Sequence, residues 1–553
     1  MKQITAAKYI IHFLEKKGIK TITGIPGGSC LPIYDALNGS SIRHVLARHE
    51  QGAGFIAQGI ARTTKKAGVC FVSSGPGSAN LLTAIADADM DSIPMVAIAG
   101  QVPSNLIGTD AFQEMDTKNV FYPVTKKVFF IQKAEELIHA LPEAFYLAEN
   151  GRPGPVLIDI PKDIQNQMMD EVYKEINISI RPLFLEHERI LEIANRINES
   201  KRPVLYTGGG AYHSGAFELL RTFIHKNSIP SVSTLMGLGV ISNDDPLFFG
   251  MLGMHGKPYT NMLLEEADLI LAFGVRFDDR ATGKVSEFCP NAEIIHVDID
   301  SYELNKIKKA NISLQADLKQ FMGQVLPEIQ TNRRKDWIEK VYQLKNNFNH
   351  SYMPNISLLN PELLIKEIAK IANPDTIITT DVGQHQMWVA QHFPFQYPGQ
   401  LITSGGLGTM GFGLPAAIGA CIANPDRKVI CFTGDGSILM NIQELATLSD
   451  LNCNLTIIIM NNNGLGLVKQ QQELFYNKNY QASGYNNNLD FSAIAKGFGI
   501  NGYKISSEIY LEEILEEALS FNGPTLIDIM IPSELNVFPM VPPGKANREM
   551  IIK

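Results

Sequence analysis

Short β-rich segments alternate with helical patterns along the whole chain, and this alternation constrains the fold more than any other feature of the sequence. Residues 69–72, 95–98, 428–432 and 455–459 are clear examples, and each is almost entirely apolar. Buried strands that are separated by helices are typical of parallel sheets with helices on both faces. The sequence therefore predicts an α/β fold of doubly wound parallel sheets.

An internal repeat relates the first and last thirds of the chain. Residues 154–160, Gly-Pro-Val-Leu-Ile-Asp-Ile, are echoed by residues 523–529, Gly-Pro-Thr-Leu-Ile-Asp-Ile. Upstream of each copy an apolar strand leads into a glycine-rich turn, at residues 74–78 and 433–437. Buried strands can resemble each other by chance, but two matched features in the same order favour a duplicated domain.

The middle third has the pattern of a nucleotide-binding domain. Residues 202–210 and 267–274 are predicted strands that end in glycine, and residues 294–298 are a predicted strand that ends in an aspartate. In Rossmann-like domains a helix N-terminus binds phosphate and a carboxylate at a strand end binds a ribose hydroxyl. Because the sequence has no GxGxxG motif, this pattern alone does not specify the ligand.

The chain length of 553 residues fits three or four domains of about 150 residues each. We expect linkers near residues 177–188 and near residues 330–360, and the second of these is polar and helical. These linkers divide the chain into three domains at about 1–180, 185–345 and 355–553.

Composition excludes several classes of protein. The net charge is −9 and no basic run is present, which argues against a nucleic-acid partner. The six cysteines include no CxxC pair, which argues against a disulfide framework or zinc site, and we expect buried thiols. The longest apolar runs are far shorter than the ~20 residues that span a membrane. The first residues run directly into a helical pattern without room for a targeting peptide, so we expect a cytoplasmic protein.

The strongest single motif is Gly-Asp-Gly-Ser at residues 434–437, at the end of a predicted strand. Asn462 follows Asp435 by 27 residues and also closes a predicted strand. Mg²⁺ prefers oxygen ligands and often combines one or two protein ligands with phosphate and water. Asp435, the Asn462 side-chain oxygen and the Gly464 carbonyl can supply three ligands, and a diphosphate the rest. The alternative is an ordinary turn and a polar loop, although each motif closes a buried strand.

This GDG and NN spacing resembles the fingerprint of thiamin-diphosphate-dependent enzymes. By that resemblance Glu50, in Arg-His-Glu-Gln-Gly-Ala at residues 48–53, would exchange a proton with N1′ of the pyrimidine ring. This raises the acidity of the 4′-amino group, which then removes the C2 proton of the thiazolium. The alternative for Glu50 is a surface helix position, but its glycine-rich, apolar flank favours a buried one.

The resemblance covers nearly the whole chain and narrows to the large catalytic subunits of biosynthetic acetohydroxyacid synthases, isozyme I branch. The segments that carry it are residues 26–29, 108–114, 252–256, 274–280 and 410–415. Residues 252–256 and 274–280 are similar to the FAD-binding stretches of the biosynthetic enzymes. The resemblance therefore implies a central FAD-binding domain between a pyrimidine-binding and a diphosphate-binding domain, although an empty relic of such a domain is the alternative.

The resemblance assigns residues to each cofactor. For thiamin diphosphate and Mg²⁺ they are Glu50, Pro76, Asn80, Val382, Gly383, Gln384, His385, Gly408, Met410, Asp435, Gly436, Ser437, Asn462, Gly464 and Leu467. For FAD they are Arg152, Gly208, Gly209, Thr234, Leu252, Gly253, Met254, His255, Gly274, Val275, Arg276, Phe277, Asp278, Asp298, Ile299 and Asp317. The Gly408 carbonyl would accept a hydrogen bond from the 4′-amino group. Met410 would bend the cofactor, although an ordinary core methionine fits the sequence equally well.

The implied reaction decarboxylates pyruvate and joins the resulting hydroxyethyl carbanion to a second 2-keto acid, giving 2-acetolactate or 2-aceto-2-hydroxybutyrate, the first common step of branched-chain amino-acid synthesis. By resemblance Arg280 would bind the carboxylate of the second acid, because arginine offers a bidentate contact. A salt bridge to Asp278 or Asp279 is the alternative for Arg280. Phe112, Gln113 and Lys162 would line the same cleft.

One position departs from the family. Most biosynthetic members have a tryptophan in an RQWQ-like stretch, where this chain has Gln471 within Lys-Gln-Gln-Gln at residues 469–472. The two acceptor acids differ by one methylene, and binding that methylene in an apolar pocket contributes only ~1–3 kcal/mol. Loss of the apolar tryptophan wall weakens this discrimination. We therefore expect a weak preference for 2-ketobutyrate over pyruvate as the acceptor.

Other functions remain open at this point. A catabolic acetolactate synthase and an FAD-using pyruvate oxidase are the nearest alternatives, and a non-catalytic nucleotide-binding paralogue is a third. The resemblance implies a homodimer or tetramer with sites shared between chains, and a possible small regulatory subunit. Residues 538–547 are rich in proline and glycine, which favours an ordered flap over the site, although a frayed tail is nearly as compatible.

Overall fold

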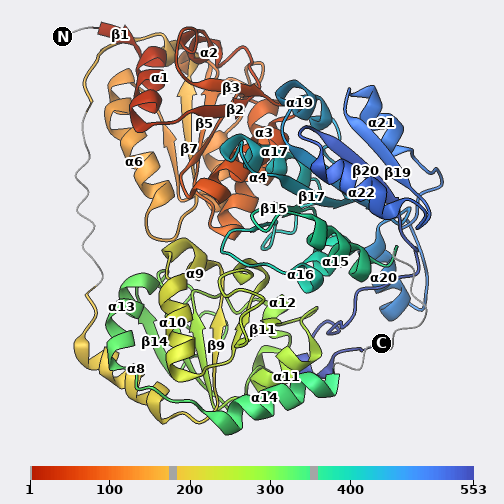
Figure 1. Ribbon diagram of the computed structural model, residues 1–553. Helices are drawn as coiled ribbons and strands as arrows, with labels where there is room; N and C mark the ends of the chain where they lie inside the picture. The colour runs from red at the N-terminus through yellow and green to blue at the C-terminus, as the bar shows by residue number, and fades with distance from the viewer. Residues whose placement is uncertain (1–2, 174–183, 349–358, 553) are drawn as a thin grey trace.

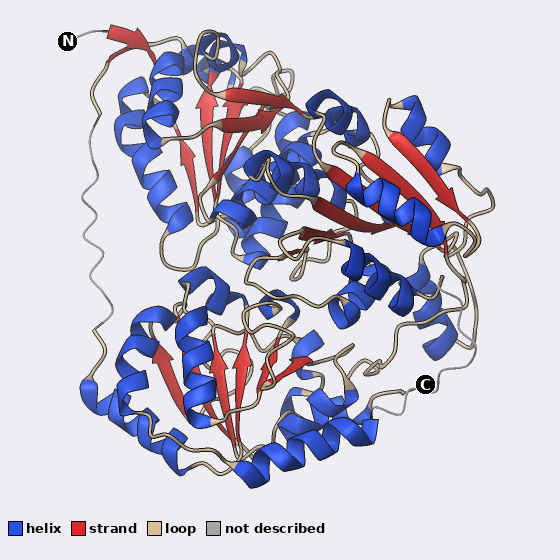
Figure 2. Ribbon diagram, in the orientation of Figure 1, coloured by secondary structure: helices blue, strands red, loops and turns tan. Residues whose placement is uncertain are grey.

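Three separate six-stranded sheets organise the computed structural model, which describes residues 3–173, 184–348 and 359–552. Every pairing within these three sheets is parallel, and helices cover both faces of each (Figures 1 and 2). The predicted α/β class with doubly wound sheets is therefore confirmed. No helix among the described residues is long and apolar enough to cross a membrane.

The first sheet has the strand order β3-β2-β4-β5-β7-β6. Its strands are β2 (Thr21–Gly24), β3 (Arg43–Leu46), β4 (Gly68–Val72), β5 (Met95–Gln101), β6 (Lys127–Phe130) and β7 (Pro155–Pro161). The helices around it are α1 (Ala6–Lys17), α2 (Leu31–Ala36), α3 (Glu50–Thr64), α4 (Pro76–Asp91), α5 (Thr117–Phe121), α6 (Leu137–Glu149) and α7 (Lys162–Gln165). A separate antiparallel pair, β1 (Gln3–Thr5) with β8 (Met168–Asp170), ties the start of this region to its end.

The third sheet has the order β16-β15-β17-β18-β20-β19. Its strands are β15 (Ile377–Thr380), β16 (Leu401–Ile402), β17 (Val429–Gly434), β18 (Leu455–Asn461), β19 (Asn501–Ile505) and β20 (Thr525–Met530). Its helices are α15 (Pro361–Ile371), α16 (Gln384–His392), α17 (Gly413–Ala423), α18 (Asp435–Ile438), α19 (Glu444–Leu451), α20 (Gly466–Phe475), α21 (Phe491–Gly497) and α22 (Leu511–Ser520).

The first and third sheets have the same topology. If the six strands of each sheet are counted along the chain, both have the spatial order 2-1-3-4-6-5. The repeated heptapeptides fall on the sixth strand of each sheet, β7 and β20, and the glycine-rich turns follow the third strand of each, β4 and β17. The predicted duplication is confirmed by this match.

The middle sheet has the order β11-β10-β9-β12-β13-β14, which is 3-2-1-4-5-6 along the chain and matches the order of dinucleotide-binding Rossmann sheets. Its strands are β9 (Pro203–Thr207), β10 (Ser231–Ser233), β11 (Phe248–Met251), β12 (Leu269–Phe273), β13 (Glu293–Asp298) and β14 (Ile312–Gln315). Its helices are α8 (His187–Glu199), α9 (Gly209–Ser214), α10 (Phe217–Asn227), α11 (Pro258–Glu266), α12 (Asp279–Thr282), α13 (Leu318–Glu328) and α14 (Lys335–Phe348).

The linker expected at residues 330–360 contains a helix, α14, as its pattern indicated. Trp337 and Val341 of α14 are buried in the central core, and residues 349–358 lie outside the described part of the chain. The other expected linker, 177–188, is described only from residue 184 onward. Five cysteines are buried as expected, but Cys453 is partly exposed. The exact domain boundaries stay a prediction.

The first and third sheets are joined through two helices that approach each other at the level of the backbone. A Cβ atom at Gly59 of α3 would lie 2.1 Å from the Ala416 carbonyl oxygen of α17. A Cβ atom at Gly419 of α17 would lie 2.0 Å from the Ile56 carbonyl oxygen of α3. Glycine is therefore required on both helices, and the first and third regions stand side by side above the central one (Figure 1).

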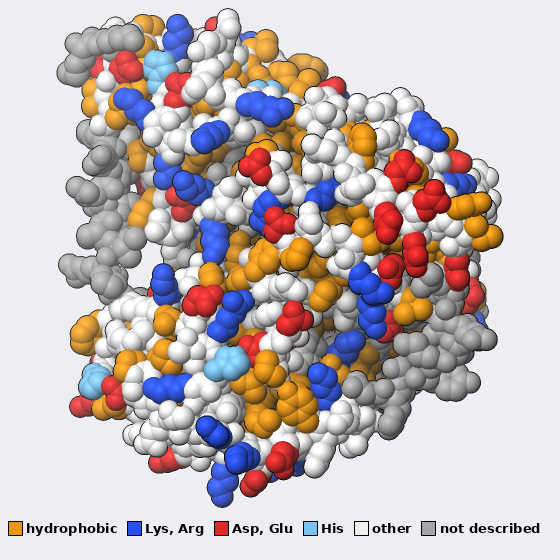
Figure 3. All heavy atoms as spheres, in the orientation of Figure 1, with side chains coloured by type: hydrophobic (Ala, Val, Ile, Leu, Met, Phe, Trp, Pro, Cys, Tyr) orange, Lys and Arg blue, Asp and Glu red, His pale blue; other side chains and the backbone are white. Residues whose placement is uncertain are grey.

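Apolar cores cross the region boundaries. One cluster of buried side chains contains residues of both the first and third regions, such as Phe55 and Phe412. Another contains residues of both the central and third regions, such as Leu205 and Ile430. Figure 3 shows acidic side chains gathered over α22, with lysine and arginine scattered across the rest of that face.

The segment after β20 returns to the central region. The Val541 N–H donates to the Met254 carbonyl at 2.9 Å, and the Asn547 side chain donates to the Ala281 carbonyl at 2.9 Å. Val537, Met540 and Val541 are buried. This segment is thus an ordered strap on the central region, in line with a flap and not with a frayed tail.

Candidate active site

Asp435 lies at the centre of the predicted metal site. It is the first residue of α18, directly after β17, and its side chain is buried. Burial raises its pKa to about 6, an effect that the backbone N–H groups of Gly464 and Asn462 oppose. Its Oδ2 atom is buried and receives no hydrogen bond from the described residues. A buried carboxylate oxygen without a partner is costly, so the site fits a bound cation.

The loop after β18 supplies the other two predicted metal ligands. The side-chain N–H of Asn462 donates to Gln384 Oε1 at 3.1 Å, which leaves the side-chain oxygen of Asn462 for another partner. The neighbouring Asn461 turns the other way, and its side chain donates to Asp528 Oδ1 at 2.9 Å. Asp435, Asn462 and Gly464 therefore come together as predicted, from the ends of adjacent strands. Oxygen ligands of this kind suit Mg²⁺.

The turn between β15 and α16 contains Val382 and Gly383, and α16 begins with Gln384 and His385. These four residues are predicted to contact the diphosphate. Ser437 Oγ donates to the Val382 carbonyl at 2.8 Å, which joins this turn to α18. Burial lowers the pKa of His385 to about 3, so its ring is neutral. Its Nε2 atom is buried and has no hydrogen-bond partner among the described residues. A neutral imidazole carries a single N–H, so Nε2 can donate to a diphosphate oxygen in the tautomer that has its hydrogen on Nε2.

Sequence analysis missed Asp381, which organises this turn. The Asp381 carboxylate accepts hydrogen bonds from the N–H groups of Val382, Gly411 and Gly413 at 2.9, 2.8 and 3.2 Å. Burial raises its pKa to about 6. A strand-end aspartate directly before the predicted Val382 was the available signal.

A cavity of about 240 Å³ adjoins Asp435 and contains further residues that sequence analysis missed. It is lined by Asp435, Leu439, Asn461, Asn463, Tyr485, Asn486, Asn487, Leu489 and Phe491. Burial raises the pKa of Tyr485, and the nearby Asp435 adds to the effect. The polar run Tyr-Asn-Asn-Asn at residues 485–488 was the signal for this wall.

Glu50 is the first residue of α3, in the first region. Asn80 of α4 donates to its carboxylate at 2.9 Å, so these two predicted residues meet, close to Pro76 at the start of α4. Glu50 is half-buried, and not fully buried as its flanking sequence suggested. The Glu444 carboxylate of the third region accepts from the N–H groups of Arg48 and His49, both at 3.0 Å, and so fixes the start of α3.

The predicted substrate residues are more dispersed. The Arg280 side chain is 65 % exposed, and its Nε lies 3.8 Å from Asp279 Oδ2 in an exposed pair. Such a pair contributes little, which leaves the guanidinium available. Asp278 instead caps α12 by accepting from the Arg280 and Ala281 N–H groups. Arg280 also reaches Met254 Sδ at 3.5 Å.

The remaining substrate residues lie on separate elements. Phe112 is 88 % exposed, and Gln113 packs on the turn at Gly75. Lys162 begins α7. No hydrogen bond or ion pair within the described chain joins these three to Arg280. Gln471 is exposed on α20, whereas its neighbour Gln470 is buried and donates to the Val537 carbonyl at 2.8 Å.

The predicted FAD residues cluster at the carboxyl ends of the central strands. Gly208 and Gly274 follow β9 and β12, and a Cβ atom at Gly208 would lie 2.4 Å from the Gly274 carbonyl oxygen. Thr234 Oγ1 is buried and has no hydrogen-bond partner within the described chain. Asp298 ends β13, and burial raises its pKa to about 6. A close-packed glycine turn, a free hydroxyl and a strand-end carboxylate fit a dinucleotide.

Other predicted FAD residues already have partners. Arg152, from the first region, donates to Asp300 Oδ2 at 3.1 Å and to Glu303 Oε1 at 3.0 Å. Asp317 caps α13. Gly209 is the first residue of α9, which follows β9. The rest lie on the loops after β11, β12 and β13: Leu252, Gly253, Met254, His255, Val275, Arg276, Phe277, Asp278 and Ile299. Burial lowers the pKa of His255 to about 4.

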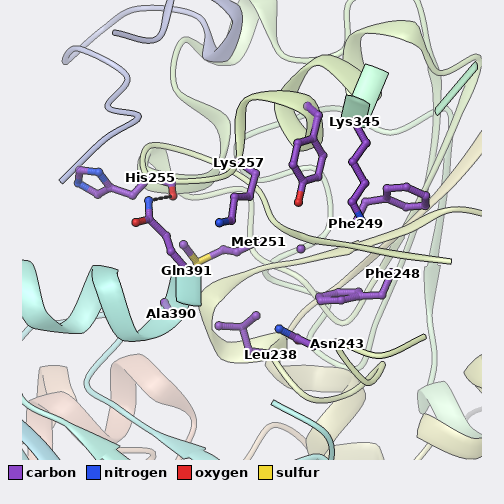
Figure 4. A pocket seen from close by; sticks show the side chains of 12 residues that line it. Leu238, Asn243, Phe248, Phe249, Met251, His255, Lys257, Lys345, Ala390 and Gln391 are labelled. Atoms are coloured by element: carbon purple, nitrogen blue, oxygen red, sulfur yellow. Dashed lines mark hydrogen bonds between the residues drawn. The ribbon is translucent and has the colours of Figure 1, made fainter. Parts of the chain in front are cut away.

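A second cavity, of about 150 Å³, lies between the central and third regions, and His255 is one of the residues that line it (Figure 4). Gln391, in the last turn of α16, donates to the His255 carbonyl at 2.7 Å, shown as the dashed line in Figure 4. Lys257 and Lys345 line this cavity together with Phe248 and Phe249. One helix, α16, therefore extends from the predicted diphosphate turn to this cavity.

Comparison with known proteins gives three successive family matches along the chain. Residues 4–120 match the N-terminal TPP binding domain of thiamine pyrophosphate enzymes, residues 190–325 the central domain, and residues 381–529 the C-terminal TPP binding domain. The large subunit of acetolactate synthase isozyme 1 from Escherichia coli K12 is 51 % identical, over 100 % of this chain and 98 % of that protein. The chain belongs to the acetolactate synthase large subunits.

Further acetolactate synthases agree with this assignment. The isozyme 2 large subunit of Escherichia coli K12 is 43 % identical over the full length of both chains. The chloroplastic acetolactate synthase 1 of Oryza sativa subsp. japonica is 42 % identical, over 99 % of this chain and 87 % of that protein. The resemblance to acetohydroxyacid synthases, which are the same enzymes, is thereby confirmed, and thiamin diphosphate is the cofactor of this acetolactate synthase subunit. The roles of individual site residues stay predictions.

Proposed function

We propose that this acetolactate synthase subunit decarboxylates pyruvate and joins the two-carbon unit to pyruvate or 2-ketobutyrate, for branched-chain amino-acid synthesis. The observation that supports the site most directly is the buried, unpaired Oδ2 atom of Asp435 beside the backbone of Asn462 and Gly464. Thiamin diphosphate, when bound, supplies a thiazolium carbon that stabilises the negative charge left by decarboxylation.

The residues of the chain have distinct tasks in this proposal. Asp435, Asn462 and Gly464 hold Mg²⁺ through oxygen atoms. His385 contacts the diphosphate through its buried Nε2 atom, in the tautomer that has its hydrogen there. The Glu50 carboxyl group exchanges a proton with the pyrimidine ring. Asn80 orients this carboxyl group through the 2.9 Å hydrogen bond.

FAD is proposed as a second cofactor, in the central region. The free Thr234 hydroxyl and the half-buried Asp298 carboxylate support it, because both lie at strand ends in a sheet of dinucleotide-binding order. In this proposal FAD has a structural role, since the reaction has no net redox change. Denatured protein would release a yellow flavin that absorbance and chromatography identify.

Acceptor choice is proposed to depend on Arg280 and Gln471. The weak exposed contact between Arg280 and Asp279 leaves the guanidinium free to bind the carboxylate of the second acid. Gln471 gives no apolar wall for the extra methyl group of 2-ketobutyrate, so the preference for that acid is weak. Phe112, Gln113 and Lys162 complete the cleft.

A homodimer or tetramer with sites shared between chains is proposed as the working assembly. Phe112, Leu407 and Met440 lie near the predicted site and are 88 %, 44 % and 53 % exposed, an apolar rim that a second copy can cover. A small regulatory subunit is a proposed partner, because relatives are named large subunits.

The deciding experiment is incubation with pyruvate, thiamin diphosphate and Mg²⁺ without oxygen, followed by acid treatment and an acetoin assay. Acetolactate formation supports the proposal. Peroxide formed in air without acetolactate would instead identify a pyruvate oxidase, and carboligation without bound FAD a catabolic acetolactate synthase. Absence of any turnover at full thiamin diphosphate occupancy would identify a non-catalytic paralogue.

A further inference from the structure

Three charged side chains are buried together where the first and third regions meet. Arg62 of α3 is 5 % exposed, and Asp87 and Asp91 of α4 are 0 % and 6 % exposed. The Arg62 guanidinium donates to Asp87 Oδ1 at 3.2 Å and to Asp91 Oδ2 at 2.9 Å. It also lies 4.9 Å above the ring of Phe412. We call these three residues the Arg62 cluster.

The Arg62 cluster holds one segment of the third region, residues 403–409. Arg62 donates to the Thr403 carbonyl at 3.0 Å. Asp91 accepts the N–H groups of residues 405 and 406 at 3.0 and 2.7 Å. Asp87 Oδ2 accepts from the hydroxyl of Ser404 and, at 3.0 Å, from that of Thr409.

Charge balance explains why the cluster and the segment need each other. One guanidinium faces two carboxylates, which leaves one buried negative charge without a counter-charge in the cluster. Burial, followed by the charge of Asp91, raises the pKa of Asp87 to about 6. The hydroxyl and N–H donors of residues 404–409 compensate this charge, since buried charges require hydrogen bonds.

The held segment carries a predicted cofactor contact. Gly408 lies between Leu407 and Thr409, with a left-handed φ of 71°. The residues on either side of Gly408 are fixed, because the Thr409 N–H donates to Ser404 Oγ at 2.9 Å. The hydroxyl groups of Ser404 and Thr409 both donate to Asp87. Leu407 and Gly408 themselves project outward and are exposed. The cluster therefore anchors the base of a turn whose tip is free to meet a ligand.

Central-region side chains close the other side of the segment. A Cβ atom at Gly405 would lie 2.4 Å from Met236 Sδ, and one at Gly406 would lie 3.0 Å from an Arg276 guanidinium nitrogen. Met236 and Arg276 thus contact the segment at Gly405 and Gly406, and a side chain at either glycine would displace them.

We propose that Arg62, Asp87 and Asp91 are positioning residues, which fix the backbone of residues 403–409 so that the Gly408 carbonyl is held where it accepts from the 4′-amino group of thiamin diphosphate. The inference rests on the proposed function. It assigns a catalytic consequence to residues that do not touch the cofactor.

The experiment uses Thr409→Val, which removes one donor to Asp87 at nearly constant shape, and Thr409→Ser, which keeps the donor, as its matched control. Asp87→Asn is a second variant. The main readout is the rate of C2-proton exchange of bound thiamin diphosphate, measured by NMR after acid quench. Thiamin diphosphate affinity, flavin content and the KM for pyruvate are measured alongside.

Misplacing a catalytic group by about 1 Å can cost about 100-fold in rate. We expect Thr409→Val to slow C2-proton exchange by about 10- to 100-fold, with cofactor affinity and KM changed less than about threefold, and Thr409→Ser to restore exchange. A normal rate of C2-proton exchange in fully loaded Thr409→Val and Asp87→Asn overturns the positioning role. The role is also overturned if these variants lose stability or cofactor affinity while the fraction that is folded and loaded exchanges the proton at the normal rate. Failure of the unaltered protein to exchange the proton or form acetolactate would contradict the proposed function instead.

Discussion

Replacing Gly419 by alanine tests whether direct contact between α3 and α17 sets the position of Glu50. Gly419 lies in the middle of α17, and the added Cβ would lie 2.0 Å from the Ile56 carbonyl oxygen. Backbone atoms cannot move to another rotamer, so the helices must separate by about 1 Å or more to reach normal contact. Because Glu50 begins α3, this separation displaces its carboxyl group.

The magnitude follows from two opposing effects. Alanine in place of glycine inside a helix contributes about 1 kcal/mol of stability. Overpacking a well-packed core costs about 1–3 kcal/mol, and the backbone contact places this case at the upper end. The net loss is about 2 kcal/mol, which lowers Tm by about 4–8 °C for a cooperative unit of 150–250 residues.

The assay compares Gly419→Ala with Gly323→Ala by differential scanning calorimetry of the holoenzyme. Gly323 is also inside a helix, α13, but a Cβ atom there meets nothing within 4 Å. We expect Gly323→Ala to be up to about 1 kcal/mol more stable and fully active. A Tm for Gly419→Ala at or above that of the unaltered protein, or unchanged C2-proton exchange in it, would refute the reasoning.

Four other outcomes are expected. Glu50→Gln should lower kcat by about 10²- to 10⁴-fold while thiamin diphosphate affinity, measured by fluorescence titration, stays nearly unchanged. Asp435→Asn should weaken Mg²⁺-dependent cofactor binding, and calorimetry that finds equal Mg²⁺ affinity would contradict the ligand assignment. Gln471→Trp should raise the preference for 2-ketobutyrate by at most about 10- to 200-fold in a competition assay with mixed acids. Burial lowers the pKa of Lys257, and nearby lysines add to this, so the unfolding free energy should rise as pH increases through that lowered pKa towards 10.5. Lys257→Met should make this slope shallower by the contribution of Lys257, while Lys126 and Lys428, whose pKa values burial also lowers, keep theirs, and urea titrations at several pH values measure the difference.

The architecture could be predicted from the sequence because its signals are local. The alternation of buried strands with helices implies parallel sheets, and the repeated heptapeptide implies a duplication. The first and third sheets do have the same strand order. The metal motif was readable for the same reason. Asp435 and Asn462 each follow a strand, and adjacent parallel strands end at one edge.

Residues that act across long sequence separations were missed. Asp381 holds the N–H groups of Gly411 and Gly413, and Asp87 receives the Thr409 hydroxyl from a different region of the fold. No periodicity or local motif encodes such contacts, because they depend on how two helices pack against a distant turn. The half-burial of Glu50 was also missed, because its glycine-rich, apolar flank is buried in α3 while Glu50 itself stands at the first position of that helix.

The shared apolar cores have a consequence for motion. Because one buried cluster includes residues of the first and third sheets and another includes residues of the central and third, the third sheet cannot open without exposing apolar surface of both neighbours. Amide hydrogens in β17 and β18 should therefore exchange only through the largest opening of the molecule. In contrast, β2 and β10 contribute buried apolar side chains only to clusters confined to their own regions, and can be released in smaller openings. The duplicated units, alike in topology, would then differ in how often they open.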